Sequence, residues 1–363
     1  MNQSKDIDSQ QSLVEVMLEF VRAAVLERDP IIPRGAEIDW GKLMDMSAEH
    51  GLLALVWDGI CKLPQELQPP RQQRINWGLS AQETYKTFDS QVKVLKKIIN
   101  TCEMSGMRLL LLKGLGLSSL YPRPQARLCS DIDIFLFDDY EKGNQIWNSY
   151  LVKEIGKHST IYLDGIMIEN HNNFLEPNTI QKRKIIRYIK SSLSDVIRTD
   201  GGYYVLPIMT NLVFLTFHTL KHFQEGLTIP IRNIVDFALF LNNNSDSINS
   251  TECSRILKDL NLIKGFELLR YFSKLILQFD FEDYHFYTIP ESDRAIFEQT
   301  LLIEKHDRVN ARLLRIPFGT KKDRKTIVLL KYIPRNYSFK QIYVPVFMDC
   351  IRKVLHVPEN ATI

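Results

Sequence analysis

The sequence has few cysteines and no paired arrangement of them. Its 363 residues include five, none of them in a Cys-x-x-Cys motif: Cys61, Cys102, Cys129, Cys253 and Cys350. An odd, scattered set argues against a disulfide framework and against a cysteine-based zinc site. We therefore expect a protein that folds in a reducing compartment.

Long apolar runs and a strong net charge are also lacking. No run approaches the roughly 18 apolar residues of a membrane span, and the start, MNQSKDIDSQQ, has no apolar core like that of a signal peptide. With 46 basic and 43 acidic residues the net charge is +3, which is too balanced to indicate a nucleic-acid or membrane partner. We expect a cytoplasmic protein without a membrane span. Nucleic acid remains a possible partner that the net charge does not indicate.

Helical spacing of apolar residues dominates both ends of the chain, which is longer than one hydrophobic core usually organises. An apolar stripe that starts at the capping box of Ser12 and Glu15 predicts a helix over 12–27. Similar patterns predict helices over residues 40–61, 79–104, 138–156, 207–223 and 231–241, with a basic helical segment from about 179. We expect three parts: an N-terminal helical region (1–85), a core (86–200) and a C-terminal helical region with a basic tail (201–363).

Strand-like segments occur only in the middle of the chain. The apolar run LLLL ends at Lys113-Gly114, and DIDIF begins at residue 131. Two further runs, STIYL and IMIEN, flank Asp164-Gly165, which is a strong signal for a two-residue β-hairpin turn. Strands in the centre with helices on both sides predict an α+β fold.

Three acidic residues in these strands form a candidate catalytic and metal-binding set. Side chains alternate along a strand, so Asp131 and Asp133 share one face, and Glu169 and His171 share a face of the second hairpin strand. Carboxylates on one face can hold Mg²⁺ or Mn²⁺ together with the phosphates of a nucleoside triphosphate. The same Asp-Ile-Asp triplet at 6–8 has no strand around it, and we expect a solvated tail there.

The segments LLLKG, LYPRPQARLCSDIDIF and IMIENH together resemble the uncharacterised nucleotidyltransferase family of the DNA polymerase beta-like superfamily. The resemblance covers most of the chain and implies a small mixed sheet flanked by helices. It also implies that Asp131 and Asp133 are the metal pair and that Glu169 is the third acid. The implied reaction moves a nucleoside monophosphate from a nucleoside triphosphate to an acceptor hydroxyl on a small molecule, an RNA end or a protein.

The phosphates of such a substrate need positive charge and hydrogen-bond donors close to the acids. The turn after LLLL offers a lysine, backbone N–H groups and serine hydroxyls, and Arg127 offers a further charge. The family also has a histidine-bearing helix and an Arg-to-Asp helix, which FHTLKHF and IRNIVDFALF resemble. The predicted nucleotide-binding residues are Lys113, Gly114, Gly116, Ser118, Arg127, His171, His218 and Arg232.

Three alternatives remain open at this point. A module that keeps the fold could bind a nucleotide or a protein without catalysis. Basic segments at 182–190 and 308–331 could bind nucleic acid, which would make binding strongly salt-dependent. Arg232 and Asp236, four residues apart, could form a salt bridge that only packs helices. Zinc at His218 and His222 is disfavoured, because HTLKH lacks the acid that follows the first histidine in metallopeptidases.

Overall fold

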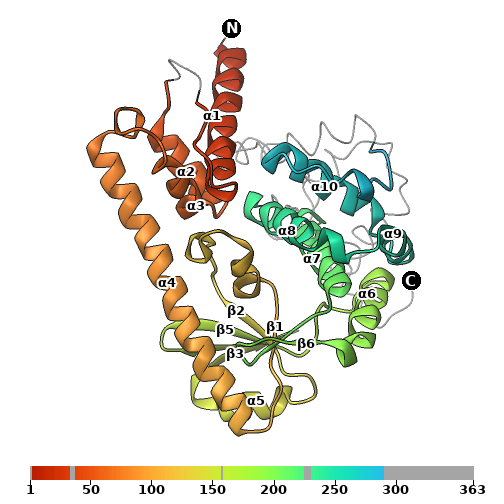
Figure 1. Ribbon diagram of the computed structural model, residues 1–363. Coiled ribbons are helices and arrows are strands. Elements are labelled where there is room, and N and C mark those ends of the chain that lie inside the picture. Colours follow the sequence, from red (N-terminus) through yellow and green to blue (C-terminus); the bar gives the residue numbers. More distant parts are fainter. Residues whose placement is uncertain (1, 33–36, 157, 225–229, 290–363) are drawn as a thin grey trace, which may run out of the picture.

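The computed structural model describes residues 2–32, 37–156, 158–224 and 230–289 (Figure 1). The predicted basic tail beyond 289, including 308–331, lies outside these residues. Among the described residues no helix has the length and apolar character that crossing a membrane requires.

A mixed sheet of seven strands lies at the centre of the described chain, in the order β3-β4-β5-β2-β1-β7-β6. The strands are β1 (Leu110–Leu111), β2 (Ile132–Phe135), β3 (Leu151–Ile155), β4 (His158–Leu163), β5 (Ile166–His171), β6 (Ile197–Arg198) and β7 (Tyr204–Val205). Strands β2 and β5 pair in parallel, as do β1 and β7, and the other neighbours are antiparallel. Together with the helices on both sides (Figure 1), this confirms the predicted α+β fold with a mixed sheet.

The predicted hairpin is present as β4 and β5. Asp164 and Gly165 have φ angles of +52° and +77°, and Leu163 pairs with Ile166 across the turn. Two successive positive φ angles are typical of a type I′ turn, whose twist matches that of the two strands. This turn therefore sets the register of the whole hairpin.

The N-terminal region is helical, as predicted, but its helices begin and end at other residues. They are α1 (Asn2–Val25), α2 (Trp40–Glu49), α3 (Leu53–Ile60) and α4 (Arg71–Met104). Because α1 begins at Asn2 instead of Ser12, residues 6–8 are helical and do not form the expected tail. The single helix expected over 40–61 is two helices, since Gly51 takes a φ of +69° and ends the first.

The prediction of one helix over 138–156 is wrong in its second half. Helix α5 (Tyr140–Ile146) is followed by β3 at the edge of the sheet. Residues 151–155 pair antiparallel with β4. A segment of only five residues can match both the 3.6-residue period of a helix and the two-residue period of a strand. Pairing with β4 makes this segment a strand.

The C-terminal region is helical, as predicted. It contains α7 (Ile208–Gln224), α8 (Ile231–Asn244), α9 (Ser250–Asp259) and α10 (Ile263–Leu277), and α6 (Ile180–Ser191) precedes it as the expected basic helical segment. Its buried residues share one apolar cluster with those of α1 and α3, and the Arg22 side chain donates to the carbonyl oxygen of Ile276 at 2.9 Å. The two ends of the described chain therefore pack against each other.

The two faces of the sheet meet different partners. Ile132, Ile134 and Ile168 belong to an apolar cluster with Val94 and Ile98 of α4, which runs along that face (Figure 1). Leu110 and Phe135 belong to the cluster that contains the C-terminal helices. Because side chains alternate along a strand, Asp133, which lies between Ile132 and Ile134, and Glu169, which follows Ile168, face away from α4.

Candidate active site

The three predicted acids come together on the face of the sheet opposite α4. Strands β2 and β5 are parallel neighbours, and their register places Asp133 beside Glu169. The buried isoleucines on either side of Asp133 anchor β2 against α4, so the aspartate must point the other way. Ligand oxygens of Asp131, Asp133 and Glu169 all lie within 4.8 Å of one another.

Asp133 is the most buried of the three, with 1% of its surface exposed. Its Oδ1 contacts Lys113 Nζ at 2.9 Å and His171 Nε2 at 2.8 Å. Its Oδ2 is buried and has no hydrogen-bond partner among the described residues. Burying a carboxylate oxygen without a partner is costly, so this oxygen is the point of the site that most needs a cation or a donor.

Electrostatics separate the three acids. Burial opposes ionisation of Asp133, but Lys113 and His171 outweigh it and hold the pKa of this carboxyl below its ordinary value. Burial likewise opposes ionisation of Glu169, and His171 beside it brings its net pKa below the ordinary value. Burial and the charge of Asp133 raise the pKa of Asp131. Asp133 and Glu169 are therefore carboxylates at neutral pH.

The Lys113-Gly114 turn approaches the acids through its backbone. Gly114 has a φ of +41°, and a Cβ atom there would lie 3.0 Å from Cys129 Sγ and 3.7 Å from Asp133 Oδ2. Despite burial, the charges of Asp133 and Asp131 raise the pKa of Lys113. A positive charge and a buried stretch of backbone are thus brought next to the unpartnered oxygen.

Gly116 and Ser118 lie in the short 3₁₀ segment that follows (Gly114–Leu120). The Gly116 N–H donates to the carbonyl oxygen of Lys113 at 2.7 Å. Ser118 is buried, and its hydroxyl donates to the carbonyl oxygen of Leu115 at 2.7 Å. Both groups therefore stabilise the shape of the turn.

Arg127 forms a buried ion pair with Asp236 of α8. Its Nη2 and Nε donate to the two carboxylate oxygens at 2.7 and 3.0 Å, and Tyr121 donates its hydroxyl to the same acid at 2.7 Å. The sequence suggested Arg232 as the partner of Asp236, whereas the structure pairs this acid with Arg127. The loop that leads to Asp131 is thereby tied to the C-terminal helices.

Arg232 itself turns toward the loop before β2. Its Nη1 donates to the carbonyl oxygen of Leu128 at 3.0 Å, and its Nε is buried without a hydrogen-bond partner in the part of the chain that the structure describes. Burial, followed by the charge of Arg127, lowers its pKa. His218 lies on α7, with its ring centroid 6.0 Å from that of Phe214. Of the predicted residues, Lys113, Gly114 and His171 thus lie at the acids, and Arg232 lies at the neighbouring loop.

A family model described as uncharacterised nucleotidyltransferase matches residues 36–278 of the 363. The chain belongs to this family. The match runs from α2 to the end of α10 and includes both acid-bearing strands, and it supports nucleotidyl transfer in general and a nucleotide as substrate. No curated protein and no solved structure matches the chain.

The three acids of this nucleotidyltransferase-family chain fit a hard divalent cation. Mg²⁺ and Mn²⁺ prefer oxygen ligands, and the set offers three carboxylates within reach of one another. The unpartnered Oδ2 of Asp133 lies in this set. The donor chemistry and the unpartnered oxygen both suit such an ion.

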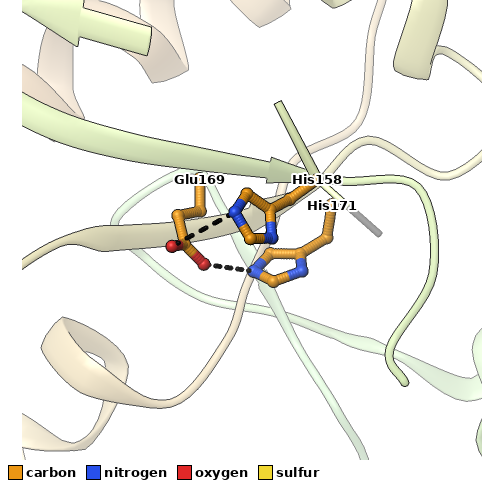
Figure 2. Close-up of side chains that lie close together, drawn as sticks. All are labelled: His158, Glu169 and His171. Atoms are coloured by element: carbon orange, nitrogen blue, oxygen red, sulfur yellow. Dashed lines mark ion pairs between the residues drawn. The ribbon is translucent and has the colours of Figure 1, made fainter. Parts of the chain in front are cut away.

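His158 is a residue of the site that the sequence reading missed. Its Nε2 lies 3.4 Å from Glu169 Oε1, and it pairs across the hairpin with His171. The hairpin turn carried the necessary signal, since a two-residue turn at 164–165 places residue 158 opposite residue 171. Figure 2 shows both imidazoles beside the Glu169 carboxylate.

Proposed function

We propose that this protein is a metal-dependent nucleotidyltransferase that moves a nucleoside monophosphate from a nucleoside triphosphate to an acceptor hydroxyl. The observation that carries the proposal is Asp133, a buried carboxylate with one unpartnered oxygen, beside Asp131 and Glu169. Lys113 already pairs with one oxygen of this carboxylate, and the other, buried oxygen still lacks a donor or a cation. The family match supports the reaction class.

Asp131, Asp133 and Glu169 would hold Mg²⁺ or Mn²⁺. Such an ion stabilises the charge that develops on the attacking and leaving oxygens of phosphoryl transfer. Among the three acids, Glu169 combines a lowered pKa with a side chain that is 18% exposed. We assign it the task of accepting the proton of the acceptor hydroxyl. His171 holds Asp133 in orientation through its contact at 2.8 Å.

Two cationic residues suit the triphosphate. Lys113 is 16% exposed and stands at Asp133 Oδ1, where it presents its charge at the edge of the acid set. Arg232 has a buried guanidinium nitrogen without a partner, and a desolvated cation of this kind favours an anion such as phosphate. The backbone of Gly114 and Gly116 lets the substrate approach closely. We also propose that His218 of α7 helps to bind the nucleotide.

Arg127 and Ser118 have a supporting role in this proposal. Arg127 ties the loop before β2 to Asp236, and Ser118 stabilises the turn after Gly114. Neither group needs to touch the nucleotide in order to matter. Loss of either would displace residues that do.

The test is transfer of label from α-³²P nucleoside triphosphates, each supplied in turn with Mg²⁺ or Mn²⁺. Small hydroxyl compounds, RNA ends and proteins of a cell extract serve as acceptors. We expect labelled product with the wild type and a loss of at least about 100-fold in Asp133→Asn and Asp131→Asn, as for removal of one strong electrostatic group. Asp164→Asn, an exposed hairpin acid, should transfer normally. The proposal falls if the two site variants retain wild-type transfer and triphosphate binding.

A second candidate function is nucleotide or protein binding without catalysis. It is favoured by the contacts at Asp133 Oδ1, where Lys113 already supplies a positive charge and His171 lies at 2.8 Å. This reading predicts that the triphosphate binds but that no label is transferred. Turnover by the wild type would exclude it.

A further inference from the structure

We propose that His158, Glu169 and His171 form a second cation site, which takes a first-row transition-metal ion such as Zn²⁺ in preference to Mg²⁺. The three side chains converge on one face of the β4–β5 hairpin (Figure 2), and one potential ligand atom from each lies within 4.8 Å of the others. Two of the three donors are imidazole nitrogens. Imidazole suits transition metals, whereas Mg²⁺ selects oxygen.

The spacing of the donors fits a shared ion better than it fits hydrogen bonds. His158 Nε2 lies 3.4 Å from Glu169 Oε1, and His171 Nε2 lies 3.4 Å from Glu169 Oε2. Good N–H···O bonds are about 2.7–3.2 Å long. Two ligands that each lie about 2.1 Å from a tetrahedral ion are separated by roughly 3.4 Å. The carboxylate is thus placed where an ion could bind between it and either ring.

The backbone holds these donors in a fixed arrangement. His158 pairs with His171 across the hairpin, and Glu169 precedes His171 by two residues on the same face. The ring centroids of the two histidines are 5.3 Å apart. His171 is 2% exposed, while His158 and Glu169 are 22% and 18% exposed. The cluster is therefore rigid on its inner side and accessible on its outer side.

This second site adjoins the proposed nucleotide site and deepens that proposal. Glu169 belongs to both donor sets, and His171 Nε2, which lies 2.8 Å from Asp133 Oδ1, would exchange that contact for the ion when the second site is filled. An ion held by the histidines would therefore sit next to the three acids and tune the orientation of the acid they share. The inference concerns metal choice and can be measured without turnover.

The experiment uses Co²⁺ as an optical probe on the full-length protein after treatment with a chelator. Co²⁺ bound by nitrogen and oxygen at low coordination number absorbs strongly in the visible range, whereas octahedral Co²⁺ with oxygen ligands absorbs weakly. We expect one equivalent of Co²⁺ to give an intense band that Zn²⁺ abolishes and excess Mg²⁺ does not. His158→Gln should lose the band and bind Zn²⁺ at least about tenfold more weakly.

Three comparisons make the outcome decisive. His285→Gln, the same substitution at a histidine of the segment that follows α10, should keep the band. Asp131→Asn should also keep it while losing labelled transfer. For the wild type loaded with one equivalent of Cu²⁺, a paramagnetic ion that imidazole suits, electron spin-echo spectra should show coupling to ¹⁴N, which does not depend on how well any variant folds.

A Co²⁺ spectrum that is unchanged in His158→Gln, or the absence of ¹⁴N coupling in the wild type, overturns this site. Labelled transfer by a wild type with no histidine-dependent band would refute the second site and leave the proposed function intact. A histidine-dependent band in a protein without transfer would do the reverse. If the histidines only transfer protons, labelled transfer with Mg²⁺ would continue while the spin-echo spectra of the metal-loaded wild type showed no coupling to ¹⁴N. That outcome also refutes the second site.

Discussion

The Arg127–Asp236 ion pair makes a sharp prediction for stability. Both side chains are at most 6% exposed, and the carboxylate also accepts from Tyr121. Asp236→Asn keeps the shape of the side chain but leaves Arg127 charged and buried, with Arg232 as a second cation nearby. Removing one partner of a buried pair costs about 3–5 kcal/mol. Asparagine can still accept one hydrogen bond, so we expect a loss near the lower end, about 3 kcal/mol in the free energy of unfolding.

The measurement is equilibrium unfolding in urea, followed by circular dichroism. The matched control is Asp164→Asn, in which the same substitution removes an exposed pair with Lys97 at 2.6 Å, with side chains 61% and 52% exposed. Exposed pairs contribute about 0–1 kcal/mol, and asparagine tolerates the positive φ at 164. If the two variants lose the same free energy, burial of the Arg127 charge is not what stabilises the loop. The double variant Arg127→Met, Asp236→Asn should recover part of the loss, because the buried charge of Arg127 is removed together with its partner.

Two further predictions follow from contacts elsewhere in the structure. Gly114→Ala places a Cβ atom 3.0 Å from Cys129 Sγ at a φ of +41°, so it should lower both the free energy of unfolding, measured in urea, and the affinity for triphosphate, measured by titration calorimetry. The control is Gly106→Ala, at a φ of +66°, where a Cβ atom would have no other described residue's atom within 4 Å. It should cost only the backbone strain of about 1–2 kcal/mol and leave binding unchanged. Glu19 is buried, which opposes ionisation, but Arg28 and the Ile31 N–H lower its folded pKa below 4.5. Its ionised form therefore stabilises the fold above pH 4.5. The difference in unfolding free energy between wild type and Glu19→Gln should shrink as the pH falls below that value. A difference that does not change with pH would contradict this prediction.

The parts of the fold that the sequence predicted are those set by neighbours in the chain. The Asp164-Gly165 turn needs only two residues with positive φ, and the alternation in DIDIF needs only the period of one strand. Strand β3 was missed because its identity depends on pairing with β4. The start of α1 at Asn2 was missed because its first turns carry no apolar stripe.

The same distinction applies to the site. The shared face of Asp131 and Asp133 follows from the period of a strand, and the place of Glu169 follows from the hairpin. The sequence therefore predicted the two aspartates as one group and Glu169 as a separate one. The parallel register that places Asp133 beside Glu169 is a long-range contact. Sequence spacing alone also left Arg232 open as a partner of Asp236, because it could not show that the loop at 121–129 folds back onto α8.

The parallel pairing of β2 and β5 also bears on the order of folding. Asp133 lies in β2, which pairs with β1, and Asp131 directly precedes β2, whereas Glu169 with its histidines belongs to the β4–β5 hairpin. The two-residue turn lets the hairpin close quickly, whereas joining it to β2 requires closure of a much longer loop. The complete set of donors therefore forms only when the two strand pairs dock. A bound ion would slow the separation of these two units, because it would link segments whose nearest common backbone contact is the β2–β5 ladder.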